Sequence, residues 1–198
     1  TLSFPLIIDI DMFAEGVVSY GANKIFLSET EVSMEYPFGI MAVEKNDEFF
    51  FSGTIGFMLP LTRINSEWEA VSITGQYLFN GLGYSVPSLF ENQEGIGSLK
   101  ALGDISPYDL MQRGMHYAAC FVSWNEILDS DFSTSVFWIA NLTDGSWQIS
   151  PAITWDIIDY ARATLTVPIF YGDTVDEYTS QGRSAGIKFD VSLGSGSV

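Results

Sequence analysis

Apolar and polar residues alternate along much of this chain with a period of two. The clearest stretch is 146–157, where one set of alternate positions is apolar and the other is small or polar. The apolar set is Trp147, Ile149, Pro151, Ile153, Trp155 and Ile157. A period of two is that of a β-strand with two unlike faces. The pattern does not say whether the apolar face meets a protein core or lipid.

About nine segments alternate in this way, and they predict an all-β, antiparallel fold. Most of them are longer than the about five to six residues of an average soluble strand. They are close to the about nine to eleven residues that a tilted membrane strand needs. We expect strands at 2–13, 26–41, 49–62, 69–80, 115–124, 131–142, 147–157, 161–171 and 184–193.

Short and long connections alternate between these segments. The sequences RINSE (63–67), NEILDSD (125–131) and DIIDY (156–160) are short, whereas 81–114 and the acidic stretch 172–182 are long. One rim of the sheet is therefore expected to carry tight turns and the other to carry loops. Two connections break the rule: LTDG (142–145) is short on the looped side, and 14–25 is long on the tight side.

The composition limits the classes of function. Charged residues are 17% of the chain, against about 25% in soluble domains. No apolar run approaches the about 18 residues of a membrane helix. A net charge of −17 with eight Lys plus Arg excludes nucleic-acid binding, which needs a basic surface. The single Cys120 excludes an intrachain disulfide framework.

The composition of the polar face indicates that the apolar face meets lipid rather than a protein core. A soluble sandwich exposes many Lys and Glu residues to water, but here the polar positions are mostly Ser, Thr, Gly, Ala and Gln. Aromatic residues lie near both rims, as they do at bilayer interfaces: Trp68, Trp124, Trp155 and Tyr160 at the tight rim, Tyr84, Trp147 and Tyr171 at the other. A membrane barrel with a wet lumen is favoured; a soluble sandwich or lipocalin-like barrel is the alternative.

With its strand pattern, its alternating turns and its last strand SAGIKFDVSL (184–193), the chain resembles the C-terminal portion of a bacterial outer-membrane β-barrel of the porin-like kind. In that family the last strand usually ends on an aromatic residue, and here Leu193 or Val198 takes its place. The resemblance implies a location in the bacterial outer membrane, among lipid and lipopolysaccharide. It implies a single transmembrane domain over 1–198, with an outer loop insert at 81–114.

An odd number of strands predicts an incomplete barrel. Bacterial single-chain barrels have even numbers of antiparallel strands. We expect the barrel to be completed by strands upstream of Thr1, by another chain or by a homo-oligomer; a miscounted segment is the less favoured alternative.

The expected function is a pore for passive diffusion of small hydrophilic solutes, with a mild preference for cations. Alternatives are a plugged barrel with a surface-binding or assembly role and, less favoured, a barrel hydrolase. By the alternation, the charged residues of the lumen wall are Asp9, Asp11, Glu31, Glu35, Asp156, Arg162, Lys188 and Asp190. Arg162 and Lys188 are also placed to pair with Asp156 or Asp190. The loops of the looped rim add eleven carboxylates and four cations, which would attract counter-ions.

Other candidate chemistry is sparse. SPYDLMQRG (106–114) predicts a short helix, with Ser106 as its N-cap, Pro107 in its first turn and Gly114 just beyond its end. The insert either caps the rim, which we favour, or folds into the lumen. His116 is the single histidine, so a catalytic triad would need it with Ser123 or Asp109. We expect no enzyme activity, no metal site and no cofactor.

Overall fold

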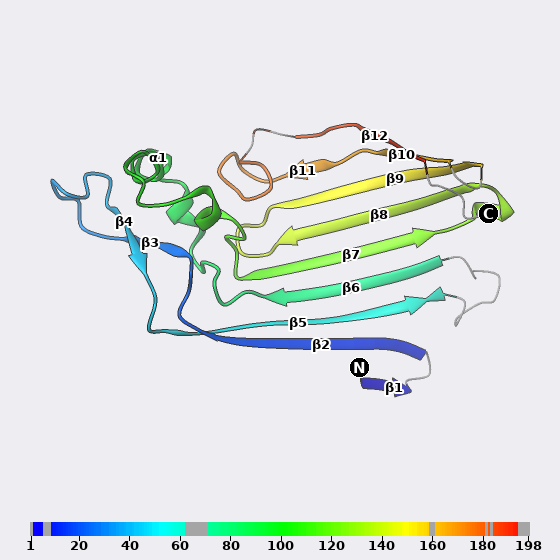
Figure 1. Cartoon of the computed structure of the whole chain (residues 1–198), viewed down its shortest axis with the longest axis horizontal. Helices are drawn as coiled ribbons and strands as arrows, with labels where there is room; N and C mark the ends of the chain where they lie inside the picture. The colour runs from blue at the N-terminus through cyan, green and yellow to red at the C-terminus, as the bar shows by residue number, and fades with distance from the viewer. Residues whose placement is uncertain are drawn as a thin grey trace.

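The chain folds mainly into one large antiparallel sheet (Figure 1). The computed structural model describes residues 2–5, 9–61, 71–158, 161–180, 182 and 184–193. The strand order is β1-β2-β5-β6-β7-β8-β9-β10-β12, and β11 pairs with β9. The bounds are β1 (Leu2–Pro5), β2 (Asp9–Tyr20), β5 (Phe49–Pro60), β6 (Val71–Phe79), β7 (His116–Trp124), β8 (Phe132–Asn141), β9 (Trp147–Ile158), β10 (Ala161–Thr166), β11 (Ile169–Tyr171) and β12 (Lys188–Leu193).

The sheet is open. Within the described residues, β1 and β12 stand at the two ends of the strand order, and each pairs with one neighbour only. The period of two predicts an antiparallel β fold, and the chain is mainly β, with one large antiparallel sheet, a separate hairpin and one short α-helix.

The register keeps the two faces of the sheet unmixed. On one face Ile153 lies opposite Leu165, which lies opposite Phe189. On the other face Thr154 lies opposite Thr164 and donates or accepts a hydrogen bond of 3.1 Å between the two hydroxyls. Because residues directly opposite one another point the same way, one apolar face and one mainly polar face extend across all the strands.

The apolar face is largely uncovered. Phe49 is 75% exposed, Phe189 is 67% exposed and Ile153 is 54% exposed. Other exposed apolar residues of this face are Val18, Phe51, Ile55, Tyr77, Trp124, Phe132, Trp155, Leu165 and Val191. The polar face also carries exposed Met58, Phe121 and Phe137, but most of its positions hold small hydroxyl or amide residues. No helix of the described residues packs broadly on the apolar face.

The buried core lies at one end of the sheet, in a unit that we call the cap, residues 21–48 and 80–114 (Figure 1). It contains the hairpin β3 (Ile25–Glu29) and β4 (Ile40–Glu44), the helix α1 (Gln93–Leu102), and the 3-10 helices η3 (Pro87–Phe90) and η4 (Pro107–Leu110). Its buried residues are Phe26, Leu27, Ile40, Tyr84, Phe90, Ile96, Leu99 and Ile105, together with Phe50 of β5.

Local signals set the limits of α1. The side chain of Asn92 accepts a hydrogen bond of 3.1 Å from the Gly95 amide at the N-terminus. Gly103 ends the helix in the left-handed region, with φ 83°, where a residue without Cβ is favoured. Its buried residues Ile96 and Leu99 are one turn apart and so lie on one side.

Two of the predicted strands, 2–13 and 26–41, are wrong. The first contains two strands of the large sheet and the second contains none, so the predicted number of strands is little changed. The segment 2–13 contains β1 and the start of β2, and β2 continues to Tyr20, paired with β5. The segment 26–41 is no strand of the large sheet but part of the hairpin β3–β4, which forms a sheet of its own. Its reversal uses Gly39 with φ 68° and the bond from the Thr30 amide to the Gly39 carbonyl, 2.9 Å.

These corrections make the alternation of connections more regular. The long connection 21–48 now joins β2 to β5 at the same end as 80–115, which joins β6 to β7. The predicted turn 63–67, Trp68 and the last two residues of DIIDY, including Tyr160, lie outside the described residues.

The insert 81–114 contains helices, but not quite the one expected. SPYDLMQRG forms the short 3-10 helix η4, which ends at Leu110 rather than near Gly114. The longer helix α1 was not predicted. The insert packs on the hairpin β3–β4 at the rim. In the described part of the chain, no helix is long and apolar enough to cross a membrane.

Candidate functional site

Four of the predicted wall residues form two ion pairs on the polar face. Arg162 lies directly opposite Asp156 and binds it through two hydrogen bonds, Nε to Oδ1 at 2.5 Å and Nη2 to Oδ2 at 3.1 Å. Lys188 Nζ lies 3.0 Å from Asp190 Oδ2. The expectation that these cations pair with neighbouring carboxylates is confirmed. Since both pairs are exposed, they fix side-chain positions more than they stabilise the fold.

The other predicted wall residues are not together. Asp11 lies on β2, opposite Met58, on the polar face. Asp9 begins β2, and its side chain lies outside what the structure describes. Glu31 and Glu35 lie in the loop between β3 and β4, so their predicted place on a strand of the large sheet is wrong. The physical reason is the chain reversal at Gly39, which the alternation through 26–41 hides.

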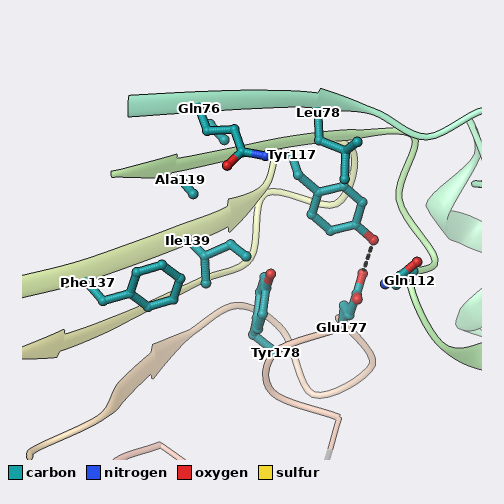
Figure 2. A pocket seen from close by; sticks show the side chains of 10 residues that line it. Gln76, Leu78, Gln112, Tyr117, Ala119, Phe137, Ile139, Glu177 and Tyr178 are labelled. Atoms are coloured by element: carbon teal, nitrogen blue, oxygen red, sulfur yellow. Dashed lines mark hydrogen bonds between the residues drawn. The ribbon is translucent and has the colours of Figure 1, made fainter. Parts of the chain in front are cut away.

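A segment whose sequence predicts only an acidic loop folds over the polar face. This covering segment, 172–180, connects β11 to the stretch before β12. Glu177 Oε2 accepts a hydrogen bond of 2.6 Å from the Tyr117 hydroxyl and one of 2.9 Å from Asn141 Nδ2. Figure 2 shows the Tyr117 to Glu177 bond between the strands and the segment. The segment is therefore attached to the ends of β7 and β8.

Hydrogen bonds to the β8–β9 turn hold the same segment. The Glu177 amide donates to Asp144 Oδ2 at 3.0 Å. Asp144 Oδ1 in turn accepts from the amide and the hydroxyl of Ser146, at 2.9 and 2.7 Å. Asn141 is 1% exposed, and a buried amide needs such partners because an unpaired one is costly.

Arg113 joins the segment to the cap. Its Nη1 donates to the Val175 carbonyl and its Nη2 to the Ser180 hydroxyl, both at 3.0 Å. The guanidinium also lies 4.7 Å from the centre of the Phe90 ring, a cation–π distance. The Arg113 side chain thus contacts both the cap and the covering segment.

A cavity of about 360 Å³ lies between the covering segment and the sheet. Its walls are Gln76, Leu78, Gln112, Tyr117, Ala118, Ala119, Phe137, Ile139, Glu177 and Tyr178. In Figure 2, the side chain of Tyr178 reaches from the segment toward the strand residues. Burial raises the pKa of Tyr178, and the charges of Glu177 and Asp144 raise it further. Tyr178 is therefore a neutral hydrogen-bonding group at ordinary pH.

A polar group inside the cap has a structural role. Asp109 Oδ1 accepts from the Ile25 amide at 2.9 Å, and Oδ2 accepts from the amide and hydroxyl of Ser106 at 2.7 and 2.6 Å. Burial acts to raise the pKa of Asp109, but these hydrogen bonds and the Lys24 charge outweigh it and lower the pKa. Burial lowers the pKa of Lys24. These bonds attach the hairpin to the insert.

The residues of the hypothetical triad are used elsewhere. His116 Nδ1 lies 2.6 Å from the Tyr77 hydroxyl, on the apolar face. Ser123 lies on the opposite face of the same strand, 2.8 Å from the Ser72 hydroxyl. Asp109 is bound within the cap. In the described ranges, no group of three His, Cys, Asp or Glu side chains is arranged to hold a metal ion.

Comparison with known proteins adds no relative. No family model matches the chain, and neither a curated protein nor a solved structure matches it. The chain is a mainly antiparallel β-sheet protein with an open sheet and a cap that contains a short helix.

Proposed function

We propose that this chain forms a large part of an outer-membrane β-barrel, and that the barrel lets small hydrophilic solutes diffuse through a water-filled lumen. The observation that carries the proposal is the uncovered apolar face, which crosses the sheet from Val18 to Val191. A soluble monomer rarely exposes a contiguous apolar surface of this extent. Lipid is the environment in which such a face is stable.

The total exposed area supports the same view. The accessible surface is 13089 Å² for a chain of 21.9 kDa, whereas a folded soluble monomer of this mass exposes about 9,300 Å². The excess is that of a sheet without a second layer. Inside a bilayer, lipid would supply the missing layer.

Aromatic side chains lie toward both ends of the apolar face. At the tight end, Phe132 stacks on Trp155 with ring centres 5.7 Å apart. At the cap end, Trp147 stacks on Tyr171 at 5.1 Å, and Tyr20 contacts Phe49 at 4.9 Å. Two aromatic bands around an apolar zone are typical of outer-membrane barrels.

The polar face would then line the lumen, and its charge favours cations. The ion pairs of Asp156 and Asp190 are close to neutral, but Glu15, which lies opposite Thr54 on the polar face, and the carboxylates of the covering segment add negative charge. The cap adds more, with Glu31, Glu35, Glu44 and Asp104 among its residues. Negative charge around an aqueous opening concentrates cations.

A second candidate is a plugged barrel whose cap binds a partner at the cell surface. The covering segment favours it, because it is bonded to Tyr117 and Asn141 across the end of the polar face. The lumen width decides between the two. That width depends on the strands that pair with the edges β1 and β12, from the same protein or from another copy.

Single-channel recording in a planar bilayer tests the proposal. The purified protein, added from detergent, should produce discrete conductance steps, with a reversal potential in a salt gradient that indicates mild cation preference. Insertion without steps would favour the plugged barrel. A protein that stays dispersed and folded without detergent, and does not insert into vesicles, would contradict both membrane roles.

A further inference from the structure

We propose that the cavity under the covering segment is a binding site for a small organic cation, a protonated amine with an apolar body. Glu177 would be the counter-ion, and aromatic side chains would hold the body of the ligand. This goes beyond diffusion through a pore, because it assigns a saturable site to particular residues. The site is defined whether or not the barrel conducts.

The carboxylate of Glu177 is fixed in place, and no cation of the described residues forms an ion pair with it. Oε2 accepts from Tyr117 and Asn141. Lys24 is close enough to respond to its charge, but its ammonium donates to the carbonyls of Leu82 and Met111. A half-buried carboxylate held this way is preorganised for an external cation.

The walls suit an organic cation better than a metal ion. Tyr117, Phe137 and Tyr178 present aromatic rings to the cavity, and Leu78 and Ile139 present aliphatic groups. Aromatic faces attract ammonium groups. A Ca²⁺ or Mg²⁺ ion requires about six oxygen ligands, which one carboxylate among apolar walls does not provide. The volume of about 360 Å³ is in the range of small-molecule pockets, about 300 to 1,000 Å³.

The surrounding charge excludes an anion. Asp144 is bonded to the Glu177 amide, and Asp173 and Asp176 lie in the same segment. Among the residues that the structure describes, Arg113 is the cation bonded to this segment, and both of its bonds go to neutral oxygen atoms of Val175 and Ser180. An anionic ligand would therefore meet repulsion, and a neutral one would leave the charge of Glu177 without a counter-ion.

Isothermal titration of the detergent-solubilised protein tests the site with three matched probes: benzylammonium, benzyl alcohol and benzoate. Benzylammonium should bind saturably, at least about tenfold more tightly than benzyl alcohol, because a hydrogen bond to a charged group contributes about that much. Benzoate should not bind. No saturable binding, or equal binding of the amine and the alcohol, would overturn the proposal.

Two variants locate the binding. Glu177→Gln keeps an acceptor for Tyr117 and Asn141 but removes the charge, and should weaken benzylammonium about tenfold or more. Asp176→Asn makes the same charge change one residue away, outside the cavity walls, and should change the affinity less than about twofold. An equal loss of affinity in both variants would mean that the negative charge of the whole segment, and not a site at Glu177, attracts benzylammonium.

A third variant covers the case in which Glu177→Gln releases the segment, which limited proteolysis within 172–180 would reveal. Phe137→Leu leaves the segment bonds intact and removes one aromatic face. It should lower the affinity for benzylammonium more than for benzyl alcohol, because the alcohol gains no cation–π attraction. Equal effects on both probes would contradict a cation site. The pore proposal is tested separately by conductance, so the two can fail independently.

Discussion

The cap and the sheet of this protein differ in where they place their apolar side chains. Phe26 in the cap is 5% exposed, whereas Phe49, in the first position of β5, is 75% exposed. The cap buries its apolar groups among its own helices and hairpin, as a small soluble domain does. The sheet leaves most of one apolar face uncovered. One solvent does not favour both arrangements, which is why we propose water around the cap and lipid along the sheet.

The largest effect is expected from truncation in the cap core. Phe26→Ala removes a ring that stacks on Phe50 at 5.7 Å and contacts Tyr84 at 5.9 Å. It should destabilise the cap by about 3 to 5 kcal/mol, the cost of a large cavity. The matched change Phe49→Ala should cost far less, because the ring is exposed. Denaturant titration followed by proteolysis of the cap measures both; equal losses would end the distinction between the two regions.

A charge on the apolar face should produce the next largest effect. Ile153→Arg should destabilise the membrane-inserted state by about 2 to 4 kcal/mol if the residue lies at the bilayer midplane. Ser150→Arg, on the polar face of the same strand, should be tolerated where the lumen is wide. Folding into lipid vesicles, followed by the shift in gel mobility of unheated samples, compares them. Similar damage from both would indicate a packed interior on the polar side.

Loosening the covering segment should give a smaller effect, confined to one end of the sheet. Tyr117→Phe removes the 2.6 Å bond to Glu177, and a bond to a charged group contributes about 1.5 to 3 kcal/mol. Protease cleavage within 172–180 should accelerate, while insertion of the sheet stays unchanged. If the barrel conducts, its conductance should rise. Tyr77→Phe, on the opposite face, is the control and should alter neither property.

Acid should weaken the cap before the sheet. The pKa of Asp109 is lower in the folded state than its unfolded value of about 3.9. Its contribution to stability is therefore present above about pH 4 and is lost as the pH falls through the folded pKa. Cap unfolding measured from pH 6 to pH 2 should show this loss, and Asp109→Asn should flatten it. An unchanged slope in the variant would assign the acid sensitivity to other groups.

The smallest effect concerns ion preference. Glu31 and Glu35 lie in the cap, not on the wall, so replacing both by Gln should lower cation selectivity only slightly. Glu15→Gln, on the polar face opposite Thr54, should lower it more. Both effects should grow in dilute salt, where the Debye length reaches about 30 Å at 0.01 M. Reversal potentials in a salt gradient measure both effects. A larger effect from Glu31 and Glu35 would mean that the cap at the rim, and not the polar face, sets the ion selectivity.

The sequence predicts the faces of the sheet well, because a period of two is a local property. Alternation around Ile153 is enough to assign its face, and the pairing of Arg162 with Asp156 follows from adjacent strands. The hairpin β3–β4 was missed because its alternation continues across the reversal. Pro37 and Gly39 were the turn signals present in the sequence.

The covering segment was beyond the reach of sequence patterns. Glu177 is 60 residues from Tyr117 and 36 from Asn141, so no local spacing joins them. The acidic composition of 172–182 predicts exposure, whereas specific long-range hydrogen bonds attach 172–180 to the sheet. A Tyr and an Asn on the polar face near strand ends are weak signals by themselves.

Arg113 makes the cap and the covering segment thermodynamically coupled. Because it contacts Phe90 in the cap and Val175 and Ser180 in the segment, the free energy of docking the segment depends on whether the cap is folded. Coupling of this kind is reciprocal. A surface ligand that binds the cap more tightly when the segment is docked must hold the segment down by the same factor. Ligand binding at the cap would thus be transmitted through the Arg113 guanidinium to the covering segment.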